Sequence, residues 1–137
     1  MGLLAGWGDD CLLLVGRCCL AAVFAVSASS KFRQVPAEVK MLANLHIPAP
    51  ATVEVVVGVC EAIGTVALVF GIYPRLASIL LAIFMVVISF VVLSFWKVAD
   101  PSPVRAQKLN AFVANFAIVG GLIYVIVAGP GAFSFMN

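Results

Sequence analysis

Four long runs of apolar residues alternate with short polar stretches along this chain. The runs cover about residues 11–30, 52–72, 76–96 and 109–128, and the third has no formal charge between Leu76 and Phe95. Each run is about 20 residues long, which at about 1.5 Å per residue of helix is enough to cross a hydrocarbon core of about 30 Å. A span in lipid must satisfy its own backbone hydrogen bonds, so each run is predicted to be a transmembrane helix.

The connections between these runs differ in kind, and the 20-residue connection over 31–50 is long for a compact bundle. In the 31–50 stretch, Val35, Val39, Leu42 and Leu45 recur at helical spacing, which predicts a short interfacial helix that ends before Pro48. Between the second and third runs, Gly71 can end one helix and Pro74 can begin the next. The fold class predicted is therefore all-α: an integral membrane four-helix bundle, forming a single domain over 1–137.

Composition supports the same environment. Hydrophobic residues make up 64% of the 137-residue chain and charged residues 10%, whereas a soluble domain has about 25% charged residues. The solvent for this much apolar surface is expected to be the lipid bilayer. The net charge of +2 and the absence of a basic stripe in the sequence argue against a nucleic-acid partner.

Basic residues predict the orientation of the chain. The opposite face has Arg75 alone. The two polar loops contain six basic residues: Lys31, Arg33, Lys40, Lys97, Arg105 and Lys108. The positive-inside rule then predicts cytoplasmic polar loops and external termini. The small residues at 25–29 could also end a cleaved signal peptide, but Asp9 and Asp10 replace the basic start that such a peptide needs.

Charged residues inside the apolar runs are the main candidates for a functional site. Arg17, Glu54 and Glu61 lie in the runs and Lys31 lies at the end of the first. A charge at the centre of a membrane helix costs about 2.5–3.5 kcal/mol, so such residues usually pair or line a polar cavity. Their spacing predicts two ion pairs between the first two spans, Arg17–Glu61 and Lys31–Glu54. The pairs either hold the helices together or line a pocket that binds a quinone headgroup or moves protons.

Other residues give weaker indications. Arg75 and Asn115 are expected in a polar pocket, with Asn115 as an interhelical hydrogen-bond donor. The cysteines are interpreted as small packing residues, although Cys11 and Cys18 with Met85 would be an alternative soft-metal site. We predict no metal centre, because the sequence has one histidine and no paired ligand motif. Close helix contacts are expected at four glycines: Gly58, Gly64, Gly120 and Gly121.

The order and spacing of several motifs resemble the DoxX family of small four-helix bacterial membrane proteins. These motifs are Gly16-Arg17, Ser27-x-x-x-Lys31, Pro48-x-Pro50, Glu61-x-x-Gly64 followed by Gly71 and Arg75, Phe95-Trp96, Asn115, Gly120-Gly121-Leu122 and Gly129-x-Gly131-x-x-Ser134. The resemblance covers nearly the whole chain. The chain departs from the family pattern at Ala28, where many members have glycine, and at 92–94, where many have a histidine.

The resemblance implies a multi-pass protein of the bacterial inner membrane that works with protein partners. The family's namesake is similar to the small subunit of a thiosulfate:quinone oxidoreductase, so a subunit of a quinone-linked oxidoreductase complex is expected. The alternatives are a non-catalytic structural or assembly subunit of a larger membrane complex, and a small-solute carrier. No cofactor is expected in the chain itself, with quinone as the candidate ligand, and the chain is not expected to be catalytic by itself.

Overall fold

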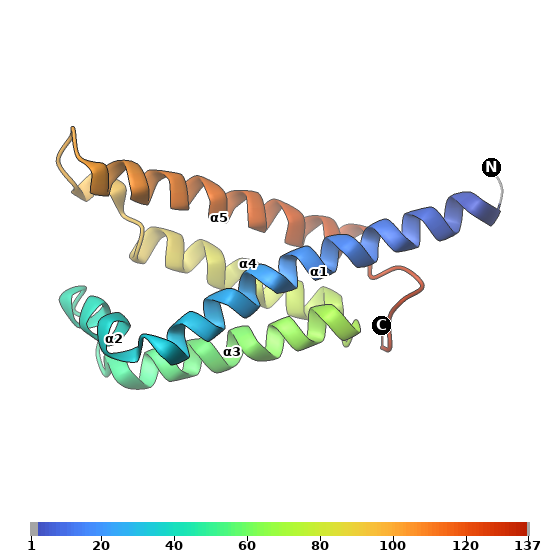
Figure 1. The fold of residues 1–137 in the computed structure, drawn as a ribbon, viewed down its shortest axis with the longest axis horizontal. Helices are drawn as coiled ribbons and strands as arrows, with labels where there is room; N and C mark the ends of the chain where they lie inside the picture. The colour runs from blue at the N-terminus through green and yellow to red at the C-terminus, as the bar shows by residue number, and fades with distance from the viewer. Residues whose placement is uncertain (1–2, 137) are drawn as a thin grey trace.

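The computed structural model describes residues 3–136 and contains four helices long and apolar enough to cross a membrane. The helical elements, in chain order, are α1 (Leu3–Arg33), α2 (Val35–Asn44), α3 (Pro50–Phe70), α4 (Pro74–Val91), the 3-10 turn η1 (Phe95–Lys97) and α5 (Pro103–Ala128). The four long helices run along the same axis of the molecule (Figure 1). The predicted all-α membrane fold is confirmed.

The long helices form two closely packed pairs. Helix α1 packs mainly on α3, and α4 packs mainly on α5, while α3 contacts α4 less extensively. The core where the pairs meet is made of buried apolar side chains: Ala21, Phe24, Leu68, Leu81, Met85 and Leu122. Large apolar side chains such as Leu12 and Val127 are 70% and 75% exposed, which fits an outer surface that faces lipid.

The short connections follow the predicted chemistry. Helix α2 is the short helix expected before Pro48, and it has Pro36 in its first turn. Gly71 ends α3 with φ +65°, in the left-handed region that glycine adopts without steric cost, and Pro74 begins α4. The turn between the two spans therefore needs only three residues.

Three helix ends differ from the predicted ones. Helix α1 begins at Leu3 instead of about residue 11, and its first turns project beyond the other helices (Figure 1). Helix α5 begins at Pro103 instead of about 109, and α4 ends at Val91, before the turn η1. Hydropathy locates the part of a helix that lies in lipid, but polar residues can extend the same helix into the interface without an apolar signal.

Glycine allows close helix contact at three of the four predicted positions. A Cβ atom at Gly58 would lie 3.1 Å from the ring of Phe32, and one at Gly121 would lie 3.0 Å from Leu20. A Cβ atom at Gly64 would lie 2.8 Å from Leu81, a core residue of α4. The prediction for Gly120 is wrong, because no atom of another helix in residues 3–136 lies within 4 Å of its Cβ position.

Candidate functional site

A buried polar cluster of Ser27, Lys31 and Glu61 joins α1 to α3. The Ser27 hydroxyl donates a hydrogen bond to Glu61 Oε1 at 3.2 Å, and Lys31 Nζ donates to Ser27 Oγ at 3.3 Å. Lys31 Nζ also lies 3.8 Å from Glu61 Oε2. Ser27 and Lys31 are four residues apart on α1, so they present one helix face to Glu61. The cluster gives Glu61, which is only 2% exposed, both a hydrogen bond and a counter-charge.

The predicted Arg17–Glu61 pair is wrong. Arg17 lies level with Gly71, ten residues beyond Glu61 on α3 and therefore about 15 Å further along the axis. Its Nη2 donates a hydrogen bond to the carbonyl oxygen of Phe133. The prediction counted depth from a first helix that begins near residue 11, whereas α1 begins at Leu3 and crosses α3 in a different register.

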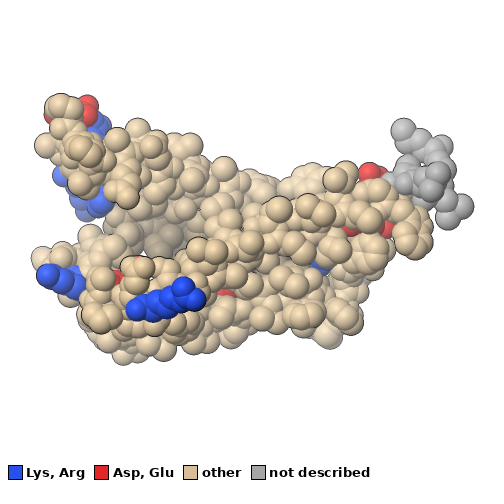
Figure 2. Space-filling view, viewed as in Figure 1, with Lys and Arg blue, Asp and Glu red and all other residues tan. Residues whose placement is uncertain are grey.

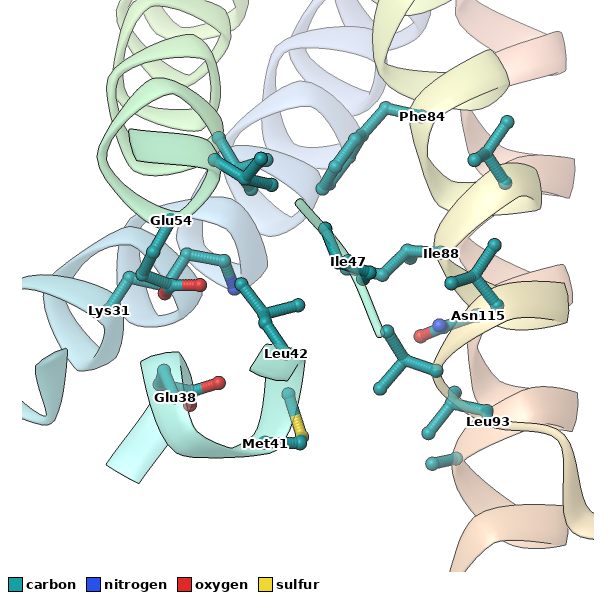
Figure 3. Close-up of a pocket in the computed structure, with 16 residues that line it drawn as sticks. Lys31, Glu38, Met41, Leu42, Ile47, Glu54, Phe84, Ile88, Leu93 and Asn115 are labelled. Carbon is teal, nitrogen blue, oxygen red and sulfur yellow. The ribbon is translucent and has the colours of Figure 1, made fainter. Parts of the chain in front are cut away.

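The predicted Lys31–Glu54 pair is also wrong in its partner, because Lys31 pairs with Glu61. Glu54 lies seven residues, or about two turns, closer to the start of α3 than Glu61 and is 3% exposed. Its Oε1 is buried and has no hydrogen-bond partner among the described residues. Glu54 and Lys31 nevertheless line the same cavity, so the two side chains are close (Figure 3).

That cavity, the inner cleft, has a volume of about 410 Å³ and lies between α2 and α3 on one side and α4 and α5 on the other. Its walls are mainly apolar, with Leu42 and Ile47 facing Phe84 and Ile88 (Figure 3). Lys31, Glu38 and Glu54 supply charge on one wall, and Asn115 lies on the opposite wall. The space-filling view shows the molecule hollowed at this end, with basic side chains nearby (Figure 2).

A second cavity of about 430 Å³ adjoins the inner cleft and shares Met41, Val92 and Leu93 with it. Lys40 of α2 and Lys108 of α5 also line this second cavity. An amphiphilic molecule in the cleft would therefore meet apolar walls and basic side chains nearby. Ligand sites of this size, mostly apolar with a few polar groups, are typical of small-molecule binding.

Asn115 and Arg75 do not share a pocket, contrary to the prediction. Asn115 Nδ2 donates a hydrogen bond to Ser89 Oγ at 3.0 Å, which confirms it as an interhelical donor in the inner cleft. Arg75 lies at the other end of the bundle, in a cavity of about 370 Å³ beside Gly129, Pro130 and Gly131. The two residues lie on antiparallel helices at different depths, which sequence spacing alone does not reveal.

The C-terminal segment 129–136 closes the end of the bundle opposite the inner cleft. Ser134 Oγ donates to the carbonyl of Gly71 at 2.8 Å, and the backbone N–H of Ala132 donates to Asp10 at 2.8 Å. Together with the Arg17–Phe133 hydrogen bond, these contacts tie the segment to α1 and to the α3–α4 turn. Arg17 is fully buried there, and its hydrogen bond joins α1 to the C-terminal segment.

The interpretation of the cysteines as buried packing residues is wrong. The thiols of Cys11, Cys18, Cys19 and Cys60 are all free, and all four residues are exposed on the helix surfaces. Met85, by contrast, is buried in the core at 7% exposure. Adjacent positions of a helix point in different directions, and apolar character alone does not distinguish a lipid-facing position from a core position.

Sequence reasoning missed two features of the site. The inner cleft depends on how the two helix pairs are spaced at the α2 end, which no local pattern reports. The role of Ser27 could have been found, because Ser27 and Lys31 are four residues apart and both belong to the family-like motif.

Comparison with known proteins identifies relatives of the chain. Inner membrane protein YphA of Escherichia coli (strain K12) is 24% identical over 123 residues, which is 90% of this chain and 86% of that protein. Surfeit locus protein 4 homolog of Schizosaccharomyces pombe (strain 972 / ATCC 24843) is 36% identical over 66 residues, 48% of this chain but only 22% of that protein. No solved structure matches the chain.

The family model for DoxX matches residues 12–94, more than half of the chain. The matched region contains α2, α3 and α4, most of α1, and the whole Ser27–Lys31–Glu61 cluster. The full-length similarity to a small inner membrane protein agrees with this match. The chain is a small integral membrane protein and belongs to the DoxX family.

Proposed function

We propose that this chain is the small membrane subunit of a quinone-linked oxidoreductase complex and that the inner cleft holds the quinone headgroup. The observation that carries the proposal is the cleft itself. It has a volume of about 410 Å³, apolar walls, and polar side chains on two facing walls. A quinone has the same division, with a polar ring and an apolar tail.

The polar groups of the cleft suit the two carbonyl oxygens of a quinone ring. Lys31 has three ammonium protons and uses Ser27 and Glu61 as partners, which leaves one N–H that can donate to a carbonyl. Asn115, on the opposite wall, donates one amide proton to Ser89 and has a second one free. The apolar tail would then follow the walls formed by α2 and α4 toward lipid.

A partner protein would supply the electron donor and would dock on the polar end of the bundle. The exposed or half-exposed basic residues of this end lie in the last turn of α1, on α2, on η1 and at the start of α5. Figure 2 shows basic side chains gathered at that end of the visible face. An acidic surface on a peripheral enzyme would be attracted to this end at long range.

Purification of the native complex in gentle detergent tests this proposal. We expect the chain to co-purify with an oxidoreductase subunit in fixed stoichiometry and with bound quinone, which extraction and chromatography would detect. A stoichiometric partner without bound quinone would contradict the quinone site and favour the alternative, a structural or assembly subunit. If the chain is isolated without a partner and transports a small solute into vesicles, the result would instead favour a carrier.

The orientation of the chain is a further prediction. In a background without the four native cysteines, we expect Ser102→Cys to react only with reagents that reach the cytoplasm, because the basic loops should remain inside. Phe135→Cys is the matched control at the other end of the bundle and should react with an impermeant maleimide in intact cells. Both positions are accessible in the structure, Ser102 partly and Phe135 at 79% exposure. Labelling of position 102 from outside would show that the orientation is the reverse of the predicted one.

A further inference from the structure

Glu54 is a buried polar side chain of the inner cleft, and one of its carboxyl oxygens has no hydrogen-bond partner among the described residues. The residue is 3% exposed, and the oxygen without a partner is Oε1. A buried carboxyl group without partners is costly, whether it is charged or neutral. A ligand atom in the cleft can supply the missing hydrogen bond.

The charges around Glu54 show why it stays unpaired. Among the described residues, Lys31 of α1 is the one cation that lines the cleft, and its charge is paired with Glu61, not with Glu54. Glu38 of α2 is the other charged group facing Glu54, and it adds negative charge. The facing positions of α4 and α5 contribute neutral groups, including Asn115. Within the group formed by Lys31, Glu54 and Glu61, one carboxylate therefore lacks a counter-charge.

A carboxyl group in excess of its counter-charges has two ways to be stable in an apolar site. It can keep its proton and donate a hydrogen bond, or it can lose the proton and accept a hydrogen bond from a donor. A carbonyl oxygen of a quinone can only accept, so it matches the protonated form of Glu54. A hydroxyl group of a quinol can donate, so it matches the ionised form.

We propose that Glu54 recognises the ligand headgroup and that its protonation state decides whether the cleft binds the carbonyl or the hydroxyl form. This inference rests on the proposed function and adds a specificity-determining residue to it. The complex with the carbonyl form then has one more proton at Glu54 than the complex with the hydroxyl form: an ionised Glu54 takes up a proton from solvent when the carbonyl form binds, and a protonated Glu54 releases one when the hydroxyl form binds. The cleft therefore prefers quinone at low pH and quinol at high pH.

The test is equilibrium binding of a short-chain ubiquinone and its quinol to the full chain in lipid nanodiscs, under anaerobic conditions, from about pH 6 to about pH 8. If each form binds one protonation state, the ratio of the quinone Kd to the quinol Kd rises about tenfold per pH unit. Glu54→Gln has no titratable proton and should show a ratio that does not change with pH. Glu38→Gln is the matched control, and it should shift the ratio while its pH slope stays as in the wild type.

The outcomes separate this inference from the proposed function. Failure of both probes to bind the wild-type chain would contradict the quinone site and the inference together. Binding of both probes with a pH-independent ratio would overturn the inference alone, and so would an unchanged slope in Glu54→Gln. The wild-type slope needs no variant, so a pH-independent ratio overturns the inference even if Glu54→Gln does not fold. In that case Glu54→Asp, which keeps the carboxyl group, should keep the slope and shift the ratio.

Discussion

Lys31→Met should destabilise the bundle by about 3 kcal/mol, because it leaves Glu61 buried without its counter-charge. The Lys31 and Glu61 side chains are 12% and 3% exposed, and their charged atoms lie 3.8 Å apart. Glu61→Gln should cost less, since a glutamine oxygen can still accept the Ser27 hydrogen bond. Folded fraction measured against increasing SDS in mixed micelles would give both free energies of unfolding.

The double variant Lys31→Met/Glu61→Gln carries no buried charge at this position, so it should recover most of the lost stability. The resulting coupling free energy should be about 1 kcal/mol or more. Arg17→Met combined with Glu61→Gln is the matched control. Because Arg17 lies about 15 Å away along the axis, its effect and that of Glu61→Gln should add within about 0.5 kcal/mol. Coupling of Glu61 to Arg17 instead of Lys31 would support the pairing predicted from sequence spacing over the one in the structure.

The sequence predicts the transmembrane architecture well because lipid leaves the backbone few options. Each apolar run had to be helical, and Gly71 and Pro74 marked the α3–α4 turn from local chemistry alone. The ends of α1 and α5 were not predictable in the same way, because residues 3–10 and 103–108 extend the helices beyond their apolar centres. Hydropathy contains no signal for such extensions.

The sequence predicts which charged residues form the candidate site, but it does not predict which of them pair. The cost of charge in lipid points to four residues, and all of them lie in buried or partly buried positions: Arg17, Lys31, Glu54 and Glu61. Which charges meet depends on the relative depth of two helices. The predicted start of α1 is about eight residues too late, and this error pairs Glu61 with Arg17. The actual partner of Arg17 is a backbone carbonyl of the C-terminal segment, and backbone atoms have no sequence signature.

The inner cleft could not be predicted from the sequence, because it forms only when the helices pack together. Its walls come from five helices, the α2–α3 connection and the segment that follows α4. Most of the lining residues are ordinary apolar side chains such as Val87 and Ile88. Nothing in their sequence distinguishes them from residues that face lipid. The cleft is also the feature on which the proposed function depends, so it is the right target for a direct measurement.

Ala111→Trp should weaken the binding of a short-chain ubiquinone at least tenfold, because Ala111 lines the inner cleft and an indole ring there occupies the space of the headgroup. Ala62→Trp is the matched control: it makes the same change at a partly buried position of α3 that lines a separate shallow surface pocket. We expect its affinity to equal that of the wild type. Both variants should first be shown to be folded by their retention volume and thermal stability.

The most direct measurement is therefore the dissociation constant of ubiquinone for the wild type, Ala111→Trp and Ala62→Trp in the same nanodiscs. We expect saturable binding to the wild type and to Ala62→Trp, and an affinity at least tenfold lower in Ala111→Trp. Equal affinity in all three folded chains, or no saturable binding to the wild type, would contradict a quinone site in the inner cleft.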